Sequence, residues 1–189
     1  NNEKQVVSEL DERLLATPSV ALERCNTIVT EMATEAVSSL KSSLNMLNKY
    51  TEAEAENIRK AEDKTDHYED ILGTYLIKLS AHQLSDADNT RVSKLLKAIG
   101  DFERISDHSV NVLESVEELR EKKMEFTPDA KKELDAICSA VSDILSITYT
   151  AFINNDIETA YKVEPLEEVI DELRNKLRDG HITRLKTSE

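Results

Sequence analysis

The chain has 189 residues, of which 39% are hydrophobic and 33% charged, and its formal net charge is −14 at pH 7. A chain of this length can bury a core in one or two domains. Only three glycines, three prolines and no tryptophan favour long helices over a many-stranded sheet. The negative charge, with no cluster of Lys and Arg to offset it, argues against a nucleic-acid-binding role.

Start and stop signals then divide the chain into helices. Thr17-Pro18 places an N-cap before a helix-starting proline, and Thr127-Pro128 repeats the signal. Thr51 followed by Glu54 forms a capping box. After a short helix or ordered arm in the first fifteen residues, the predicted helices span about 18–48, 52–83, 89–122, 128–153 and 157–178. Five helices with short connections predict an all-α, antiparallel helical bundle.

The cysteines and the hydropathy pattern bear on the cellular compartment. Cys25 and Cys138 lie in helical patterns without a CxxC spacing, which predicts two buried thiols in a reducing compartment. No run approaches about 18 consecutive apolar residues, so no membrane span is expected. The polar N-terminus does not look like a signal peptide. The chain therefore reads as a cytosolic protein or as a piece of a longer one.

Residues 100–114 place two carboxylates where a helix normally presents core residues. Glu103 and Asp107 lie four residues apart and stack on one helical face. At roughly 100° per residue, Leu96, Ile99 and Val110 fall within about 40° of Glu103 on that face. An acidic pair inside an apolar stripe is costly to bury unless arginine, a proton or a metal ion compensates the charge.

Three interpretations of this acidic pair remain open from the sequence alone. It can form a solvated ridge, be neutralised by arginine, or help to ligate a hard cation. Arg104 lies about 100° round the helix from Glu103 and is poorly placed to neutralise both acids. Glu62, Asp66 and Glu69 form a second acidic stripe. Two such helices side by side would supply the oxygen ligands that Mg²⁺, Ca²⁺, Mn²⁺ and iron accept.

The sequence offers no sign of catalysis. A di-iron bundle enzyme needs Glu-x-x-His pairs, but Thr65 and Ser106 stand three residues after Glu62 and Glu103. His108 lies about 140° from Glu103, so it is expected to be solvated or to cap a helix, and the same is expected of His67. No nucleophile–base pair or phosphate-cradling glycine loop is present. The chain is therefore predicted not to be an enzyme.

A weak internal repeat links two acidic helices. Glu62 and Glu164 are 102 residues apart, and at this offset the acidic and apolar positions that follow them correspond. The pattern is acid, three residues, acid, three residues, acid, which favours a duplicated helical unit. A second copy of the Glu103/Asp107 helix would lie near residue 205, beyond this sequence.

The segment 103–108, ERISDH, resembles the signature of the PhoU family of phosphate-uptake regulators. This resemblance implies two tandem three-helix repeats, the second here lacking its last helix, and metal-binding acid-x-x-x-acid motifs. It assigns six metal ligands: Glu62, Asp66, Glu103, Asp107, Glu164 and Glu168. The bound ion would be divalent or ferric (Fe, Mg, Mn, Zn or Ca). In the second repeat glutamate replaces aspartate at Glu168, and Pro165 biases Glu164 away from helical geometry.

The segment 10–25, LDERLLATPSVALERC, looks like the linker before the cytoplasmic PhoU-like domain of bacterial sodium/phosphate cotransporters. VEPLEEVIDEL and HITRLK near the C-terminus are similar to that subfamily too. This resemblance implies a linker over 1–16, a first repeat over 17–123 and an incomplete second repeat over 124–189. It implies a regulatory domain on the cytoplasmic side of the inner membrane, with the membrane transport domain of the same polypeptide as its partner. The alternative is a free-standing PhoU regulator of a phosphate-specific uptake system.

Two expectations concern binding partners. If the second repeat lacks its last helix, its apolar seam is exposed and favours a homodimer. Phosphate is not expected to bind directly, because no backbone amides or Lys/Arg cluster converge near the acids. A metal-dependent hydrolase is a third functional class, which elemental analysis and a phosphatase screen would distinguish.

Overall fold

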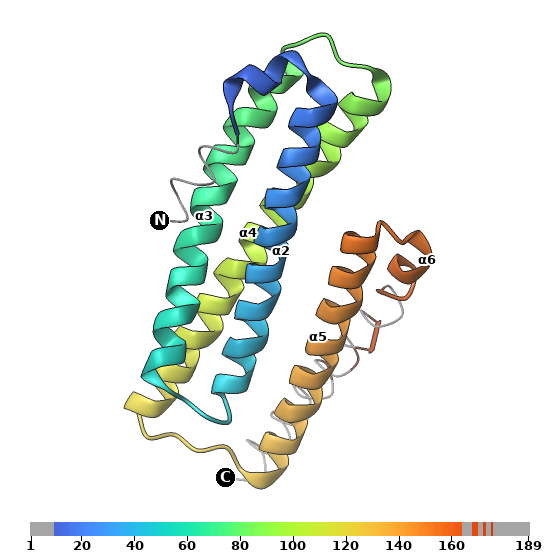
Figure 1. Ribbon diagram of the computed structural model, residues 1–189. Helices are drawn as coiled ribbons and strands as arrows, with labels where there is room; N and C mark the ends of the chain where they lie inside the picture. The colour runs from blue at the N-terminus through green and yellow to red at the C-terminus, as the bar shows by residue number, and fades with distance from the viewer. Residues whose placement is uncertain (1–9, 164–167, 170–171, 173–174, 176–189) are drawn as a thin grey trace. The chain divides into compact units, whose positions relative to one another are not determined.

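The computed structural model describes residues 10–163 together with 168, 169, 172 and 175. Within these residues the regular structure is entirely helical, which confirms the all-α prediction (Figure 1). The elements are η1 (Glu12–Ala16), α2 (Pro18–Met46), α3 (Glu52–Ser80), α4 (Asp86–Glu121), α5 (Pro128–Asn154) and α6 (Ile157–Ala160). The four long helices begin and end within about three residues of the positions that the capping signals predicted.

The chain divides into two compact units. The first, Asn1–Val116, contains η1, α2, α3 and most of α4, and the second, Glu117–Glu189, contains α5 and α6. The division falls inside α4, whereas the sequence predicts a boundary after residue 123 at the end of that helix. The assignment of a linker and two repeats stays a prediction.

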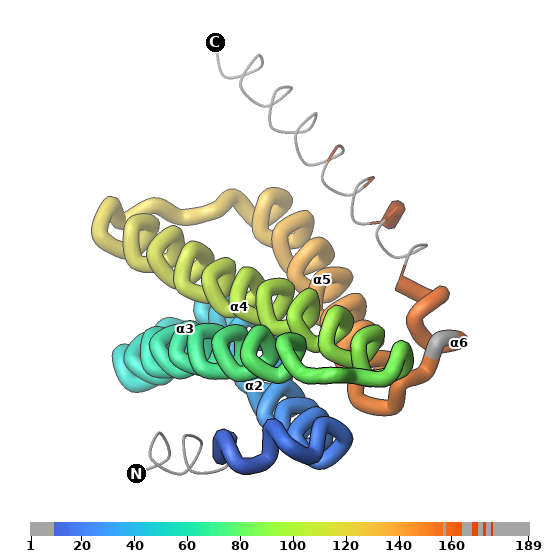
Figure 2. Tube along the Cα trace, turned by 90° about the horizontal axis from the view of Figure 1, so that it is seen from above, coloured from blue at the N-terminus to red at the C-terminus, as the bar shows by residue number. Residues whose placement is uncertain are grey.

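In the first unit α2, α3 and α4 run side by side as a three-helix bundle (Figures 1 and 2). Their apolar positions recur every three or four residues, which places one stripe of each helix in a shared core. The large side chains that are completely or almost completely buried include Leu22, Ile28, Met32, Ile58, Leu72, Leu76, Leu79, Ile99 and Leu113. Burying each of these side chains contributes about 1.5–3 kcal/mol. This core holds α3 and α4 in a fixed register.

The helix caps follow the sequence signals with one exception. Thr51 accepts a hydrogen bond from the Glu54 amide at 3.3 Å, and Thr127 accepts one from the Ala130 amide at 3.2 Å, as predicted. Thr17 precedes α2 but makes no side-chain cap, so that part of the prediction is wrong. Its hydroxyl instead donates to the Leu14 carbonyl at 3.2 Å. The short η1 helix ends at this point and leaves carbonyls that need donors.

In the second unit α5 ends at Asn154, and the next residue, Asn155, caps it in the left-handed conformation with φ 48°. Asp156 then caps α6 by accepting from the Thr159 amide at 3.1 Å. The predicted helix over 157–178 is interrupted, because α6 stops at Ala160 and a turn follows, with the Lys162 amide donating to the Thr159 carbonyl at 3.1 Å. The residues described after this turn, 163, 168, 169, 172 and 175, are again helical. Asp156 and the left-handed Asn155 together reverse the chain here.

Helix α5 is unusually apolar. By length and composition alone it could cross a membrane: its most apolar 18-residue window has a mean hydropathy of 1.6, and 11% of that window is buried. This helix contains no long uninterrupted apolar run, because serines, threonines and Asp143 lie within it, and for that reason no membrane span is expected from runs of apolar residues alone. Both cysteines are free, but Cys138 on α5 is only half-buried, so the prediction of two buried thiols holds for Cys25 alone.

Candidate metal centre

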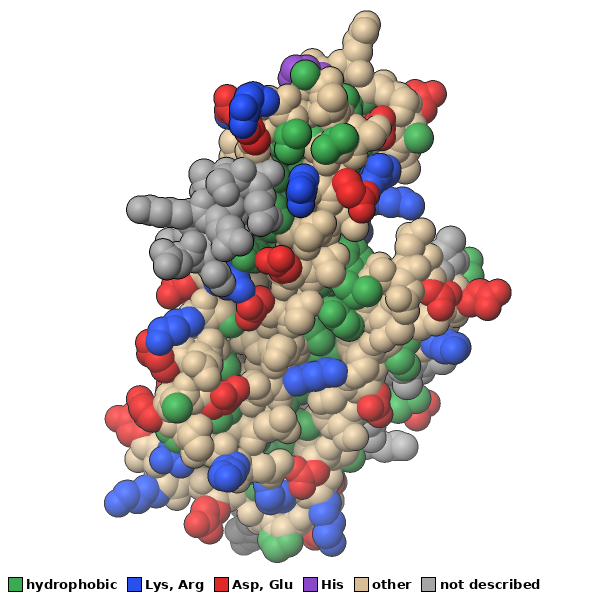
Figure 3. All heavy atoms as spheres, viewed as in Figure 1, with side chains coloured by type: hydrophobic (Ala, Val, Ile, Leu, Met, Phe, Trp, Pro, Cys, Tyr) green, Lys and Arg blue, Asp and Glu red, His purple; other side chains and the backbone are tan. Residues whose placement is uncertain are grey.

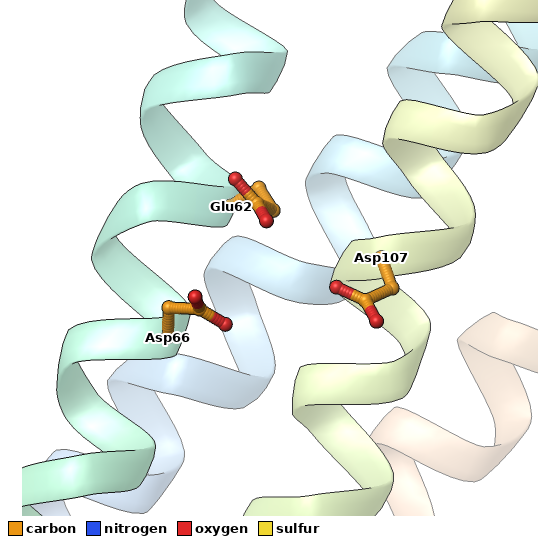
Figure 4. Close-up of side chains that lie close together, drawn as sticks. All are labelled: Glu62, Asp66 and Asp107. Carbon is orange, nitrogen blue, oxygen red and sulfur yellow. The ribbon is translucent and has the colours of Figure 1, made fainter.

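Helices α3 and α4 bring three carboxylates together on the surface of the first unit. Glu62 and Asp66 project from α3 and Asp107 from α4 (Figure 4). One oxygen from each of the three side chains lies within 4.8 Å of the other two. Atoms at this separation can share one cation, because ligand oxygens of a cation at 2.0–2.6 Å stand about 3–5 Å apart.

The packing behind these carboxylates fixes their direction. Thr65 on α3 and Ser106 on α4 are completely buried, and each is adjacent in sequence to an acid of the site. Because neighbours on a helix point about 100° apart, burial of Thr65 and Ser106 turns Asp66 and Asp107 toward the rim of the α3–α4 interface. The site therefore depends on core packing rather than on a loop.

Two further acids extend this site along the same interface. The Glu103 carboxyl shares a hydrogen bond with that of Asp107. On α3, Glu69 lies beside Gly100 of α4, where a Cβ would stand 3.9 Å from its Oε1 atom. We call these five residues the acidic cluster: Glu62, Asp66, Glu69, Glu103 and Asp107.

The crowding of negative charge changes how these acids hold their protons. Desolvation by burial, followed by the charge of Asp107 and its hydrogen bond, raises the pKa of Glu103 to about 7. Desolvation also raises the pKa of Glu62, with smaller contributions from Asp66, Asp63 and Asp107. In both cases the charged carboxylate is disfavoured. A cation placed between the helices would reverse this effect.

No lysine or arginine among the described residues forms an ion pair with the acidic cluster. Elsewhere in the same bundle, a lysine does neutralise a pair of acids. Glu31 and Glu35 form another acid-x-x-x-acid pair on α2, where the Lys64 ammonium pairs with Glu35 and is also favoured by the charge of Glu31. Lys64 in addition lies 5.5 Å from the centroid of the Tyr68 ring. One acid pair thus has an internal cation, and the cluster across α3 and α4 does not.

The donor set suits a hard cation. All of its ligands are carboxylate oxygens, which Mg²⁺, Ca²⁺, Mn²⁺ and iron accept. Zinc prefers nitrogen or sulfur ligands, and no histidine or cysteine belongs to the group. Three protein oxygens from two helices would leave positions for water, and a bound ion would tie α3 to α4.

Of the six ligands predicted from sequence, Glu62, Asp66 and Asp107 come together, and Glu103 lies beside them through its hydrogen bond to Asp107. Glu164 lies outside the described residues. Glu168 is described and exposed. Metal ligation by all six residues stays a prediction.

His67 differs from its expected solvated role. Its side chain is half-buried, and its Nε2 atom is fully buried without a hydrogen-bond partner among the described residues. His108, in contrast, is exposed.

Comparison with known proteins gives this geometry a family context. Residues 29–116 match the PhoU domain family. The phosphate-specific transport system accessory protein PhoU homolog 1 of Thermotoga maritima is 30% identical over 92 residues, covering 49% of this chain and 39% of that protein.

The corresponding PhoU homolog of Clostridium acetobutylicum is 23% identical over 158 residues, covering 82% of this chain and 71% of that protein. No solved structure matches the chain significantly. Both relatives are named as accessory proteins of phosphate-specific transport systems, and neither is named as a sodium/phosphate cotransporter. All five members of the acidic cluster fall inside the matched segment. Residues 29–116, which are 88 of the 189 residues, are therefore similar to the PhoU domain family.

Proposed function

We propose that this protein is a PhoU-type regulator of phosphate uptake that acts together with a phosphate transport system. The observation that carries the proposal is the match of residues 29–116 to the PhoU domain, with the acidic cluster inside it. PhoU proteins form a regulatory, non-enzymatic family. This similarity supports the proposal of a regulatory role on the cytoplasmic side of the inner membrane.

The proposed regulatory element is a cation held between α3 and α4. Without a cation, desolvation by burial and, after it, repulsion between the acids disfavour the charged carboxylates of Glu103 and Glu62, whose pKa values are raised. Binding of a hard divalent or ferric ion would remove this repulsion and bring the two helices together. The ionic state of the cluster would then set the packing of the bundle that a transport system contacts.

Between the two forms of this regulator, the comparisons favour the free-standing one. Both listed relatives carry names of accessory proteins, and these names support a separate partner of a phosphate-specific uptake system. The cytoplasmic domain of a sodium/phosphate cotransporter is the second candidate, which the segment 10–25 favours through its likeness to that subfamily's linker. The gene sequence upstream of residue 1 distinguishes the two, because only the cotransporter encodes membrane helices there.

Deleting the gene in its source organism tests the regulatory role. We expect phosphate uptake to continue when external phosphate is plentiful, because the restraint on the transport system is lost. The wild-type gene should restore regulation, and so should E31Q/E35Q, which removes two acids at the same spacing outside the cluster. The variant E62Q/D107N should fail to restore it. Unchanged uptake in the deletion strain at both high and low phosphate would overturn the proposed function.

A further inference from the structure

Buried polar residues of the three long helices in the first unit gather at one level of the bundle. We call them the polar layer: Ser39, Ser43, Thr65, Ser106 and Ser109. The Ser39 and Ser109 hydroxyls lie 2.9 Å apart, which sets α2 and α4 at the same level. Thr65 joins them from α3, because its neighbour Asp66 approaches Asp107 of α4. The polar layer therefore lies directly behind the acidic cluster.

The polar layer interrupts the apolar core. Beside the loop between α2 and α3, one core cluster consists of Met46, Ala55, Ile58, Leu113 and Val116. Between Phe102 and Leu113 the buried residues of α4 are Ser106 and Ser109 alone, and the apolar residues of this stretch are only half-buried. Because apolar burial provides most of the energy of packing, α4 is held less firmly here than on either side.

The same stretch of α4 is also a weak helix by composition. Residues 105–112 read ISDHSVNV, and all of these are types with low helix propensity. Beside the same site, residues 59–64 of α3 read RKAEDK, which are good helix formers apart from the aspartate.

Two serine hydroxyls add to the weakness of residues 105–112. Ser109 donates to the Ser106 carbonyl at 2.6 Å, a local bond that competes with the hydrogen bonds of the helix. The Ser106 hydroxyl is buried without a partner among the described residues, so the closed helix leaves one polar group unsatisfied.

The two sides of α3 differ in how charge is balanced at this level. Toward α2, the Lys64 ammonium pairs with Glu35, and this cation is covalently part of the bundle. Toward α4, no lysine or arginine of the described residues pairs with the acidic cluster. Loss of a diffusible cation would therefore weaken the contact between α3 and α4 and leave that between α2 and α3 intact.

We propose that residues 105–112 of α4 unfold locally while α2 and α3 stay packed, and that a cation in the acidic cluster holds this segment closed. The role of the cation rests on the proposed function. Asp107 lies inside the segment, so it can share an ion with Glu62 and Asp66 only while the segment is helical. A partner that contacts this part of α4 would thereby respond to the occupancy of the cluster.

Hydrogen exchange of the whole chain in EDTA, followed by mass spectrometry of its peptides, tests the local unfolding. We expect the protection factors of 105–112 to be at least about tenfold lower than those of 59–67 in α3, because a helical amide exchanges when its helix opens. S106A should raise the protection of 105–112 about threefold, since it removes the unpaired hydroxyl and introduces alanine, the best helix former. The matched control S93A changes an exposed serine of α4 outside the segment and should leave this protection unchanged.

Mn²⁺ and a lysine variant test the role of the cation. Mn²⁺ should raise the protection of 105–112 about tenfold or more in the wild type and leave it unchanged in E62Q/D107N. Glu69 contributes to the negative charge around Glu103, so E69K places an ammonium there and should protect the segment in EDTA. Circular dichroism establishes that each variant is folded.

Two results would overturn the proposal. Equal protection of 105–112 and 59–67 in EDTA would exclude local unfolding of α4. An equal effect of Mn²⁺ on the wild type and on E62Q/D107N would exclude the role of the cation. Exchange is measured on the purified protein and does not depend on phosphate uptake, so its failure is distinguishable from failure of the proposed function, which the deletion strain tests.

Discussion

At the residue scale, the core of the bundle contains a buried serine hydroxyl without a hydrogen bond to any described residue. Ser106 is completely buried, and its Oγ atom has no hydrogen-bond partner within the part of the chain that the structure describes. Three residues later, Ser109 is equally buried but donates to the Ser106 carbonyl at 2.6 Å and lies 2.9 Å from the Ser39 hydroxyl. The two serines share a helix and a level of burial and differ in whether the hydroxyl is satisfied.

We therefore predict opposite effects for two matched substitutions. S106A should leave the free energy of unfolding unchanged or raise it by up to about 1 kcal/mol, because an unpaired buried hydroxyl is removed. S109A should lower it by about 1–2 kcal/mol, because its bond to Ser39 is lost. Urea denaturation of both variants measures the difference. Equal destabilisation would mean that Ser106 has a partner, such as a buried water molecule.

The ion pair on α2 and α3 gives a second prediction at this scale. Lys64 compensates Glu35 and lies near Glu31. K64M should lower the free energy of unfolding by about 1 kcal/mol, since two acids lose a partly buried counter-charge. The triple variant E31Q/E35Q/K64M, without any of these charges, should recover most of the loss in thermal unfolding. A further loss in the triple variant would contradict the electrostatic explanation.

At the element scale, the α3–α4 pair should respond to pH because of Glu103. The pKa of this carboxyl is raised to about 7 from an ordinary value near 4.5. Between these values the folded protein binds more protons than the unfolded chain, so stability falls as pH rises through this range. The protein without metal should lose about 1–2 kcal/mol between pH 5 and pH 7.5, after allowance for solvent screening.

Thermal unfolding in the presence of a chelator, at a series of pH values, measures this slope. The variant E103Q cannot titrate and should show a shallower dependence over the same range. A steeper or unchanged slope in E103Q would assign the pH dependence to other groups.

A helix boundary can be predicted from the sequence when the residues that determine it lie within a few positions of it. The four long helices and the caps at Thr51 and Thr127 were predictable because a cap acts within three residues. Thr17 has the same Thr-Pro signal, but η1 before it competes for its hydroxyl. The end of α6 at Ala160 has no comparable local signal, because Asn155 and Asp156 are equally compatible with a single break between two longer helices.

In the candidate site, too, the arrangement of acids along one helix is predictable from their spacing, whereas the approach of two helices depends on tertiary packing. The acid-x-x-x-acid spacing placed Glu103 and Asp107 on one face, but only the bundle packing shows that Glu62 and Asp66 approach Asp107. The burial of His67 was not predictable from its own helix. It lines a groove between η1 and α3, and the wall that η1 forms there depends on a contact between Tyr75 and Asp11, which are 64 residues apart.

At the scale of the whole molecule, charged side chains are spread over the surface, but their electrostatic environments differ. Lys and Arg side chains are scattered among Asp and Glu on the face shown in Figure 3 and form no extended basic patch there. Water or a single neighbouring lysine can therefore stabilise the charged form of most of these carboxylates. The acidic cluster is the place in the first unit where several carboxylates meet at a half-buried interface, and a metal ion would have its largest effect on stability there.

The central claim is that this cluster binds a cation, and the most direct measurement is the thermal unfolding of three proteins with and without Mn²⁺. At about 100 times the dissociation constant, Mn²⁺ should stabilise the wild type by about 2.7 kcal/mol, or roughly 5–10 °C for a chain of this size. E31Q/E35Q should gain the same amount.

E62Q/D107N should gain nothing from Mn²⁺ and should unfold at a higher temperature than the wild type in chelator, because the repulsion is relieved. Elemental analysis of the same samples counts the bound metal. An equal gain in E62Q/D107N, or no gain in the wild type, would contradict the claim.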